Sequence, residues 1–320
     1  MIPDFSRCKV LVIGDVMLDR YIRGICTRVS PEAPVPVISV NSPCEEVLGG
    51  AGNLAANLSA LHCQVSLLAS VGSTDQSNSS SVWRLVRSAG VFPYLRASSH
   101  RTTVKTRIIA NRQQVARVDE DGIASHFDSE WVRDAIMDSP VGLSAIILSD
   151  YGKGVLTPAA CKAAIRSGVP VFVDPKDGDW TKYAGAYGIK PNKHELARWL
   201  GRPLPEDAGE IQEILRQVSS RLGISCVLLT LGSGGMVLYH KRLTETLKIP
   251  AEEREVYDLS GAGDTALSAF VAAFSQLCAD TPSAVDLEEG LWKSLEIANR
   301  AAGISVSKPG TSVVSAKELL

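Results

Sequence analysis

The hydrophobic residues fall into short, continuous runs that are separated by segments with a helical period. Apolar runs rich in Val, Ile and Leu are typical of strands that are covered on both faces of a parallel sheet. Five runs predict such strands, at residues 9–15, 65–72, 145–150, 169–175 and 226–232. Helical patterns lie between them, at residues 52–62, 80–90, 157–168 and 208–223. The alternation of strand and helix predicts an α/β fold with right-handed crossovers.

Two segments do not follow this pattern. Residues 20–48 contain four prolines and alternating apolar positions, and residues 101–119 read as two strands joined at Asn111 and Arg112. Proline is confined to the edges and turns of sheets, because it cannot donate a ladder hydrogen bond. The two segments therefore predict a small sheet outside the main one, a lid on a single domain of residues 1–320. Two elaborated surface loops are the alternative.

Composition narrows the possible partners and environment. Among the 320 residues, 33 Lys and Arg stand against 35 Asp and Glu, a net charge of −2 that disfavours nucleic acid as a partner. The seven cysteines are scattered and form no Cys-x-x-Cys pair, which is typical of reduced thiols. No apolar stretch approaches the roughly 18–20 residues of a membrane span, and no signal peptide is recognisable. We expect a cytoplasmic protein without membrane contact.

The strongest candidate for chemistry is the segment Asp258-Leu-Ser-Gly-Ala-Gly-Asp-Thr265, followed by a run of small residues. A Gly-x-Gly turn that enters a helix points backbone N–H groups and the positive end of the helix dipole at one place, which suits an anion. An acid at the end of that turn, Asp264, is well placed to accept a proton from a hydroxyl that attacks a phosphoryl group. A tight helix entry with an acid in its first turn is the alternative.

A second glycine-rich turn, Gly49-Gly-Ala-Gly-Asn53, opens the first expected helix. Its glycines allow close approach of a small polar ligand, and the Asn53 amide offers a donor and an acceptor to sugar hydroxyls. A simple helix cap is the alternative. Three acids, each following an expected strand, are further candidates for substrate binding, because open α/β sheets bind ligands at the carboxyl ends of their strands: Asp15, Asp150 and Asp174.

Two further segments bear on nucleotide binding. Asn192 and Glu195 begin an expected helix, and this pair can hold Mg²⁺ or its water shell beside phosphates, or can simply form a capping box. Residues 230–235 invite a dinucleotide-fold interpretation, but Val237 stands where that motif needs a small residue. No Walker A sequence occurs. A nicotinamide dehydrogenase is therefore disfavoured.

These motifs, in this order, resemble the two signatures and the Asn-x-x-Glu motif of the ribokinase-like (PfkB) family of carbohydrate kinases. The resemblance implies a doubly wound, mostly parallel α/β sheet with a small β lid. It implies an enzyme that uses ATP and Mg²⁺, and a monovalent cation is a further expectation. A non-catalytic sugar or nucleotide sensor on the same scaffold is an alternative, which the intact Gly-Ala-Gly-Asp sequence disfavours.

The resemblance also implies roles for individual residues. Asp264 would be the catalytic base, and Gly261, Ala262 and Gly263 the anion hole. The nucleotide, its phosphates and Mg²⁺ would contact Asn192, Glu195, Thr230, Gly232, Gly235, Ser260 and Asn299. Mg²⁺ would bind Glu195 through water. Ser260 replaces a threonine that is frequent in relatives, and the hydroxyl is kept. Sugar hydroxyls would contact Asp15, Gly49, Gly50 and Asn53.

Several segments, among them GDVMLDRY, SPEAPVPV, LSDYGKGVL and KPGTSVVS, are similar to family members that phosphorylate D-glycero-β-D-manno-heptose 7-phosphate. This implies transfer to the C1 hydroxyl, on the way to the ADP-heptose of lipopolysaccharide. Other sugars or sugar phosphates remain alternatives, because a fold does not fix a substrate. No His-x-Gly-His motif occurs, so we expect a kinase without an adenylyltransferase domain. Basic residues expected to hold the 7-phosphate, each otherwise an ordinary surface charge, are Lys105, Arg107, Lys153 and Lys176.

The expected lid has one further consequence. Its apolar residues Val35, Val37 and Ile38 and its sheet edges would be unprotected if it stood alone. We therefore expect a homodimer in which two lids pack together.

Overall fold

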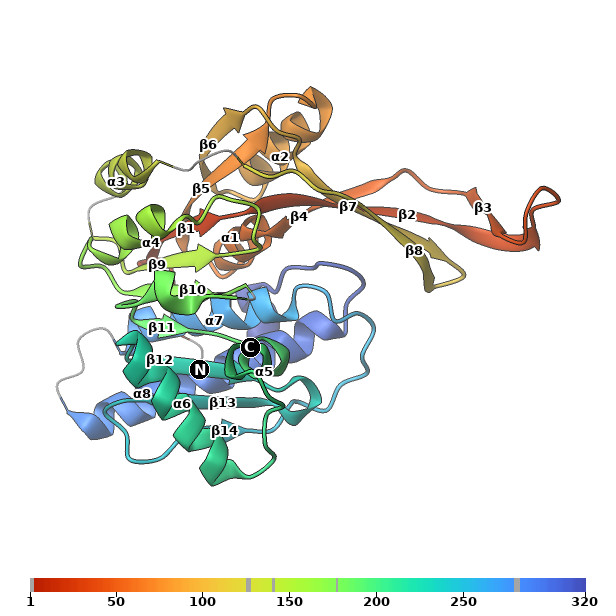
Figure 1. The fold of residues 1–320 in the computed structure, drawn as a ribbon. Helices are drawn as coiled ribbons and strands as arrows, with labels where there is room; N and C mark the ends of the chain where they lie inside the picture. Colours follow the sequence, from red (N-terminus) through yellow and green to blue (C-terminus); the bar gives the residue numbers. More distant parts are fainter. Residues whose placement is uncertain (1–2, 125–127, 140–141, 177, 279–282) are drawn as a thin grey trace.

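A central sheet of nine strands forms the body of the protein (Figure 1). The computed structural model describes residues 3–124, 128–139, 142–176, 178–278 and 283–320. The strands follow each other across the sheet as β14 (Leu247–Ile249), β13 (Met236–His240), β12 (Cys226–Thr230), β11 (Gly188–Ile189), β10 (Val171–Asp174), β9 (Ala145–Ser149), β1 (Lys9–Gly14), β5 (Gln64–Gly72) and β6 (Phe92–Ser98). All neighbours pair in parallel except β12–β13 and β13–β14. The prediction of a mostly parallel sheet is confirmed.

Helices cover both faces of this sheet. The helices are α1 (Ala51–Ala60), α2 (Gln76–Ser88), α3 (Ser129–Asp138), α4 (Pro158–Ile165), α5 (Lys193–Leu200), α6 (Ala208–Leu222), α7 (Ala262–Leu277), α8 (Ala284–Val306) and α9 (Ala316–Leu319). Two short 3₁₀ turns are η1 (Trp180–Tyr183) and η2 (Gly232–Gly234). Alternate residues of β1 enter different cores: Val10 and Val12 pack with α1, α7 and α8, and Leu11 and Ile13 pack with α4 and α6. A strand buried on both faces explains why its sequence is continuously apolar.

The elements expected from the hydrophobic pattern all occur. Each of the five expected strands and four expected helices agrees with the structure to within four residues at either end. Elements that the pattern did not indicate include α8 and the antiparallel edge of β13 and β14. In the described residues, no helix combines the length and the apolar character that crossing a membrane requires.

A second, five-stranded sheet projects from the body, as Figure 1 shows on the right. This outer sheet has the order β3 (Pro36–Val40), β2 (Val16–Val29), β7 (Thr103–Ala110) and β8 (Gln113–Glu120), and β4 (Glu45–Gly50) also pairs with β2. The hairpin between β7 and β8 turns at Asn111 and Arg112, both of which have positive φ. The turn therefore lies where the sequence indicated it.

Contacts at the base of the outer sheet attach it to the body. Arg107 Nη1 donates to Asp19 Oδ1 at 2.6 Å, so β7 and β2 are joined by an ion pair. The other Asp19 oxygen accepts from the Thr311 hydroxyl at 3.0 Å, and the Thr311 amide donates to the Tyr21 hydroxyl at 2.8 Å. The segment after α8 is thereby bonded to the outer sheet.

Candidate active site

Three carboxylates lie side by side at the carboxyl edge of the central sheet. Asp15 follows β1, Asp150 follows β9 and Asp174 ends β10, and these strands are neighbours in the sheet. Asp15 accepts three hydrogen bonds: its two oxygens accept backbone N–H groups of Tyr151, Lys153 and Val155 at 2.8, 3.0 and 3.1 Å. The predicted convergence is confirmed, and Asp15 fixes the conformation of the loop 151–155.

Asp150 fixes the start of the same loop. Its Oδ1 accepts from the Gly152 amide at 2.7 Å. Its Oδ2 accepts from the Tyr183 hydroxyl at 2.6 Å and from Lys182 Nζ. Two buried carboxylates from adjacent strands thus hold this loop against the edge of the sheet.

The two glycine-rich turns meet at the start of α7. Gly261 caps this helix with φ of 78°, and a Cβ at this position would lie 2.7 Å from Asn53 Nδ2. Only glycine fits such a contact in the left-handed region. Ala262, Gly263 and Asp264 form the first turn of α7, where the backbone N–H groups have no partner within the helix and the dipole is positive. This turn can receive an anion.

Gly49 and Gly50 lead from β4 into α1. Gly50 has φ of 58°, and a Cβ there would lie 2.4 Å from the Asp15 carbonyl oxygen. At Gly49 a Cβ would lie 2.6 Å from Asp19 Oδ2. Both glycines thus allow the base of the outer sheet to pass close to the carboxyl edge. Asn53 is placed within the first turn of α1 by the same connection.

Asp264 is buried, with 5% of its surface exposed, and it accepts two hydrogen bonds. Asn53 Nδ2 donates to Oδ2 at 2.8 Å, and the Tyr151 hydroxyl donates to Oδ1 at 2.9 Å. The Asn53 amide is itself oriented, because its Oδ1 accepts from Asn57 Nδ2 at 3.0 Å. The two bonds fix the plane of the Asp264 carboxylate.

The surroundings of Asp264 bring its pKa close to neutral pH. Burial and the nearby Asp174 raise the pKa of Asp264 to about 7, against the opposing effect of the hydrogen bonds from Asn53 and Tyr151 and of the Lys190 charge. A general base works best when its pKa lies near the working pH. Asp264 is therefore a suitable acceptor for the proton of an attacking hydroxyl.

Lys190 places a buried positive charge beside the anion turn. It follows β11, is 3% exposed, and its Nζ lies 2.8 Å from Asp174 Oδ1 and 3.3 Å from the position of a Cβ on Gly263. Burial alone would lower the pKa of Lys190, but Asp174 and Glu195 together raise it above its usual value. The side chain therefore stays an ammonium. It can face a phosphoryl group bound at the turn.

The Asn192 and Glu195 pair forms a capping box at the start of α5. Asn192 Oδ1 accepts from the Glu195 amide at 2.9 Å, and the Asn192 amide donates to Glu195 Oε2 at 2.8 Å. Both residues also line a cavity of about 230 Å³, together with Asp150, Tyr151, Asp174, Pro175, Lys176, Lys190, Gly261, Gly263 and Asp264. The capping and ligand-binding interpretations are thus compatible in this structure.

The cavity suits a hydrated divalent cation. Burial and Asp174 raise the pKa of Glu195, against the opposing effects of Lys190 and of Lys176, which also lines the cavity. No described group of three or more His, Cys, Asp or Glu residues is arranged to hold a metal directly. Mg²⁺ commonly keeps several waters and binds through one or two carboxylates plus substrate phosphates. The carboxylates of Asp174 and Glu195 fit that form of binding.

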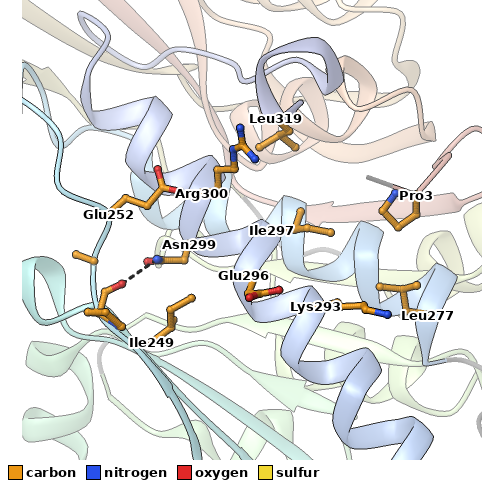
Figure 2. Close-up of a pocket in the computed structure, with 12 residues that line it drawn as sticks. Pro3, Ile249, Glu252, Leu277, Lys293, Glu296, Ile297, Asn299, Arg300 and Leu319 are labelled. Carbon is orange, nitrogen blue, oxygen red and sulfur yellow. Dashed lines mark hydrogen bonds between the residues drawn. The ribbon is translucent and has the colours of Figure 1, made fainter. Parts of the chain in front are cut away.

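A second pocket, of about 690 Å³, lies beyond the turn between β12 and β13 (Figure 2). Thr230, Gly232 and Gly235 form this turn, and the Thr230 amide donates to the Pro191 carbonyl next to Asn192. Gly235 approaches Ile249 and Pro250, whose carbonyl accepts from Asn299 Nδ2 at 2.9 Å. Figure 2 shows Asn299 on the pocket wall, and its bond to Pro250 places this wall next to the turn that Gly235 ends.

The structure brings together only some of the basic residues expected at a phosphate. Lys105 Nζ lies 5.6 Å and Lys176 Nζ 5.9 Å from the centre of the Tyr151 ring. Lys153 is instead paired with Asp121 at 2.6 Å. Arg107 is paired with Asp19, as described above. Lys105 and Lys176 are thus the two expected cations that lie beside the Tyr151 ring, and Lys176 also lines the cavity.

Three residues of the site were not indicated by the sequence analysis: Tyr151, Lys190 and Asn57. Tyr151 directly follows Asp150, and Lys190 directly precedes Pro191 and Asn192, so proximity to the motifs was the available signal. Ser260 lies in the turn before α7, where its amide donates to Asp258 Oδ1 at 2.8 Å. Asp258 Oδ2 accepts from the Gly310 amide at 3.1 Å, which ties this turn to the segment after α8.

The fold and the site define a phosphotransferase of the ribokinase type. Among solved structures, phosphofructokinase-2 from Escherichia coli in complex with potassium aligns with a TM-score of 0.77 at 15% identity, over 98% of this chain and 96% of that one. A ribokinase from Arabidopsis thaliana complexed with ribose and ATP aligns with a TM-score of 0.70 at 23% identity, over 98% and 97%. At such identities the likeness shows the fold alone.

Residues 8–318 match the pfkB family of carbohydrate kinases. The chain belongs to this family, and it is a carbohydrate kinase. Similar curated proteins are named bifunctional protein HldE: one from Rhodospirillum rubrum is 38% identical over 327 residues, and one from Methylococcus capsulatus is 40% identical over 326. Each alignment covers the whole of this chain but only 63% and 64% of the relative.

Proposed function

We propose that the chain transfers the γ-phosphoryl group of ATP to the C1 hydroxyl of D-glycero-β-D-manno-heptose 7-phosphate. The product is the 1,7-bisphosphate, which precedes ADP-heptose in the assembly of the lipopolysaccharide core. The observation that carries the chemistry is the buried Asp264, whose pKa of about 7 and fixed orientation at an anion turn suit a general base. The similarity to the HldE proteins supports the choice of a heptose phosphate.

In the proposed reaction, Asp264 accepts the proton of the C1 hydroxyl while the oxygen forms a bond to the γ-phosphorus. The bond from that phosphorus to the bridging oxygen of ADP breaks, and ADP leaves with the electron pair. The amides at the start of α7 and the Lys190 ammonium neutralise the charge on the transferring group. Because the base is preorganised, little rearrangement is needed at the moment of transfer.

Nucleotide binding is assigned to Asn192, to the turn between β12 and β13, and to the pocket that Asn299 lines. The triphosphate would lie along Thr230, Gly232 and Gly235, and the adenine would occupy the pocket of Figure 2. Asp174 and Glu195 would hold Mg²⁺ through water, and the cation would neutralise the phosphate oxygens. A monovalent cation is a further expectation. The sugar is expected to bind in the cavity of about 230 Å³ that Tyr151 lines.

The proposal is tested by measuring ATP consumption with a panel of sugars and sugar phosphates. The panel contains heptose 7-phosphate, free heptose, fructose 1-phosphate and ribose. We expect turnover of heptose 7-phosphate far above the others, and a ³¹P spectrum of the product with a new anomeric phosphate. Preferred turnover of another sugar would replace the substrate and keep the kinase. Binding of sugar and ATP without turnover would indicate a sensor.

We also propose that two copies of the chain associate through their outer sheets, in the cytoplasm where ATP is available. The outer sheet and its turns expose several apolar side chains, while Val37 and Ile38 are half-buried. The exposed ones are Ile25, Val29, Val35, Val40, Val115 and Val118. Light scattering at micromolar concentration should report a dimer. Val29→Glu should weaken the dimer, and Val285→Glu, at a still more exposed position on α8, should not. A monomeric wild type would refute the proposal.

A further inference from the structure

Tyr151 is in contact with both the candidate base and the candidate phosphate-binding cations. Its hydroxyl donates to Asp264 Oδ1 at 2.9 Å. The ammonium groups of Lys105 and Lys176 both lie within 6 Å of its ring centre. Lys105 comes from β7 of the outer sheet and Lys176 from the loop after β10. One aromatic side chain therefore links three charged groups from three different segments.

We propose that Tyr151 is a positioning residue that couples recognition of the substrate's phosphate to the placement of the base. Its hydroxyl holds the Asp264 carboxylate, and its ring spaces Lys105 and Lys176 so that they bind the phosphate at the far end of a sugar phosphate. The inference rests on the proposed function, since it takes Asp264 as the base and a phosphorylated sugar as the substrate.

The hydrogen-bonding capacity of Asp264 supports the first role. An ionised carboxylate has about four lone-pair sites. Asn53 and Tyr151 use one on each oxygen, which leaves room for the hydroxyl of the sugar. Burial and the Asp264 charge raise the pKa of Tyr151 well above its usual value, so this side chain remains a donor at all working pH values. The tyrosine thus orients the base without competing for its proton.

The environment of the two lysines supports the second role. Among the described residues, no acidic side chain forms an ion pair with Lys105 or Lys176, whereas Lys153 and Lys190 are both paired. The pKa of Lys105 is lowered by burial, against the opposing effects of Asp19 and Asp119. Two cations that are held near one ring and lack a paired carboxylate favour a dianionic ligand beside that ring. A sugar that presents one hydroxyl to Asp264 would extend along the ring toward them.

The backbone around Tyr151 is rigid enough for such a role. The Tyr151 amide is held by Asp15 at 2.8 Å, and the neighbouring Gly152 amide by Asp150 at 2.7 Å. The ring position is thus set from the edge of the central sheet. Lys105, in contrast, belongs to the outer sheet, so its distance from the ring depends on how the two sheets are placed. Binding of a phosphate would fix that placement.

Two variants of Tyr151 separate the hydroxyl from the ring. Tyr151→Phe removes the hydrogen bond and keeps the aromatic surface, whereas Tyr151→Leu removes both. Tyr187→Phe is the matched control, because its hydroxyl contacts His240 at a distance from the site. For each protein, kcat and KM are measured with heptose 7-phosphate and with free heptose across pH 5 to 9, together with Tm and ATP binding.

We expect the acid limb of kcat/KM to move up by about one pH unit in both Tyr151 variants, because loss of a hydrogen bond to the charged form raises the pKa of Asp264. Asp174 and Lys190, the other charged groups that face Asp264, are unchanged. The preference for the phosphorylated sugar should be kept in Tyr151→Phe and should fall about tenfold in Tyr151→Leu, mainly through KM. Tyr187→Phe should match the wild type in both measurements.

An unshifted pH profile in a folded Tyr151→Phe would overturn the first role. Equal preference for the phosphorylated sugar in Tyr151→Leu and Tyr151→Phe would overturn the second. If the wild type itself shows no preference for heptose 7-phosphate, the proposed substrate is wrong. In that case the pH comparison on the preferred sugar still tests the contact between Tyr151 and Asp264. If Tyr151→Leu does not fold, Tyr151→Met, which also removes the ring, replaces it.

Discussion

Replacing Asp264 by Asn separates catalysis from stability at one residue. Asn has the shape of a protonated aspartic acid, so it should occupy the same site between Asn53 and Tyr151. It cannot accept a proton. Loss of a general base typically costs about 10²–10⁴-fold in rate. We therefore expect kcat of Asp264→Asn to fall by about that factor, with ATP binding almost unchanged.

The same substitution should raise the stability of the fold at alkaline pH. Asp264 has a pKa of about 7 in the folded protein, raised from 3.8 by burial and by Asp174. Between these values the folded protein keeps a proton that the unfolded chain has lost, so wild-type stability falls as pH rises through this window. Each pKa unit corresponds to about 1.4 kcal/mol, which gives an upper bound of about 4 kcal/mol above pH 8. In Asp264→Asn, residue 264 does not titrate, so it makes no such pH-dependent contribution to stability.

The assay is denaturant unfolding of both proteins at pH 4.5, 6, 7 and 8.5, with kcat measured in parallel. The difference in unfolding free energy should be small at pH 4.5, where the wild-type acid is protonated, and should then increase in favour of Asp264→Asn. Asp286→Asn on the exposed start of α8 provides a matched control. A variant with more than a tenth of wild-type kcat would remove Asp264 from the mechanism. A difference in stability that does not change with pH would refute the environment described for it.

Two further predictions concern charged residues around the site. Lys190→Met should lower kcat by about 10²-fold and move the acid limb of kcat/KM to higher pH, because the Lys190 ammonium lowers the pKa of Asp264. Lys190→Arg should recover part of the rate. An unchanged pH profile would argue against an effect of Lys190 on Asp264. Lys105→Ala should reduce the preference for the phosphorylated sugar about tenfold with little change in Tm. Arg107→Ala should instead destabilise the fold by about 3 kcal/mol, because it leaves the Asp19 carboxylate without its partner. Equal effects of Lys105→Ala and Arg107→Ala on Tm would contradict these different roles.

The sequence predicted the parts of this molecule that depend on local pattern. Continuous apolar runs identified strands buried on both faces, and the Gly-x-Gly turn identified the start of α7. The antiparallel edge was not indicated, because the run Met236–His240 has no feature that distinguishes it from a buried parallel strand. The partners of Arg107 and Lys153 also could not be predicted. Pairing with Asp19 and Asp121 depends on how separate segments meet in space.

The two signatures of the sequence, about 200 residues apart, meet in one hydrogen bond. Asn53 from the first turn of α1 holds Asp264 from the first turn of α7, and Asn57 orients Asn53. The base and the anion turn are thus built from the segments that resemble the whole family. The cations beside Tyr151 come from the outer sheet and from the loop after β10, outside both signatures. On the proposed function, phosphoryl transfer and choice of sugar would therefore reside in different segments that meet at Tyr151. We would then expect changes in the outer sheet to alter the preferred substrate while Asp264 stays in place.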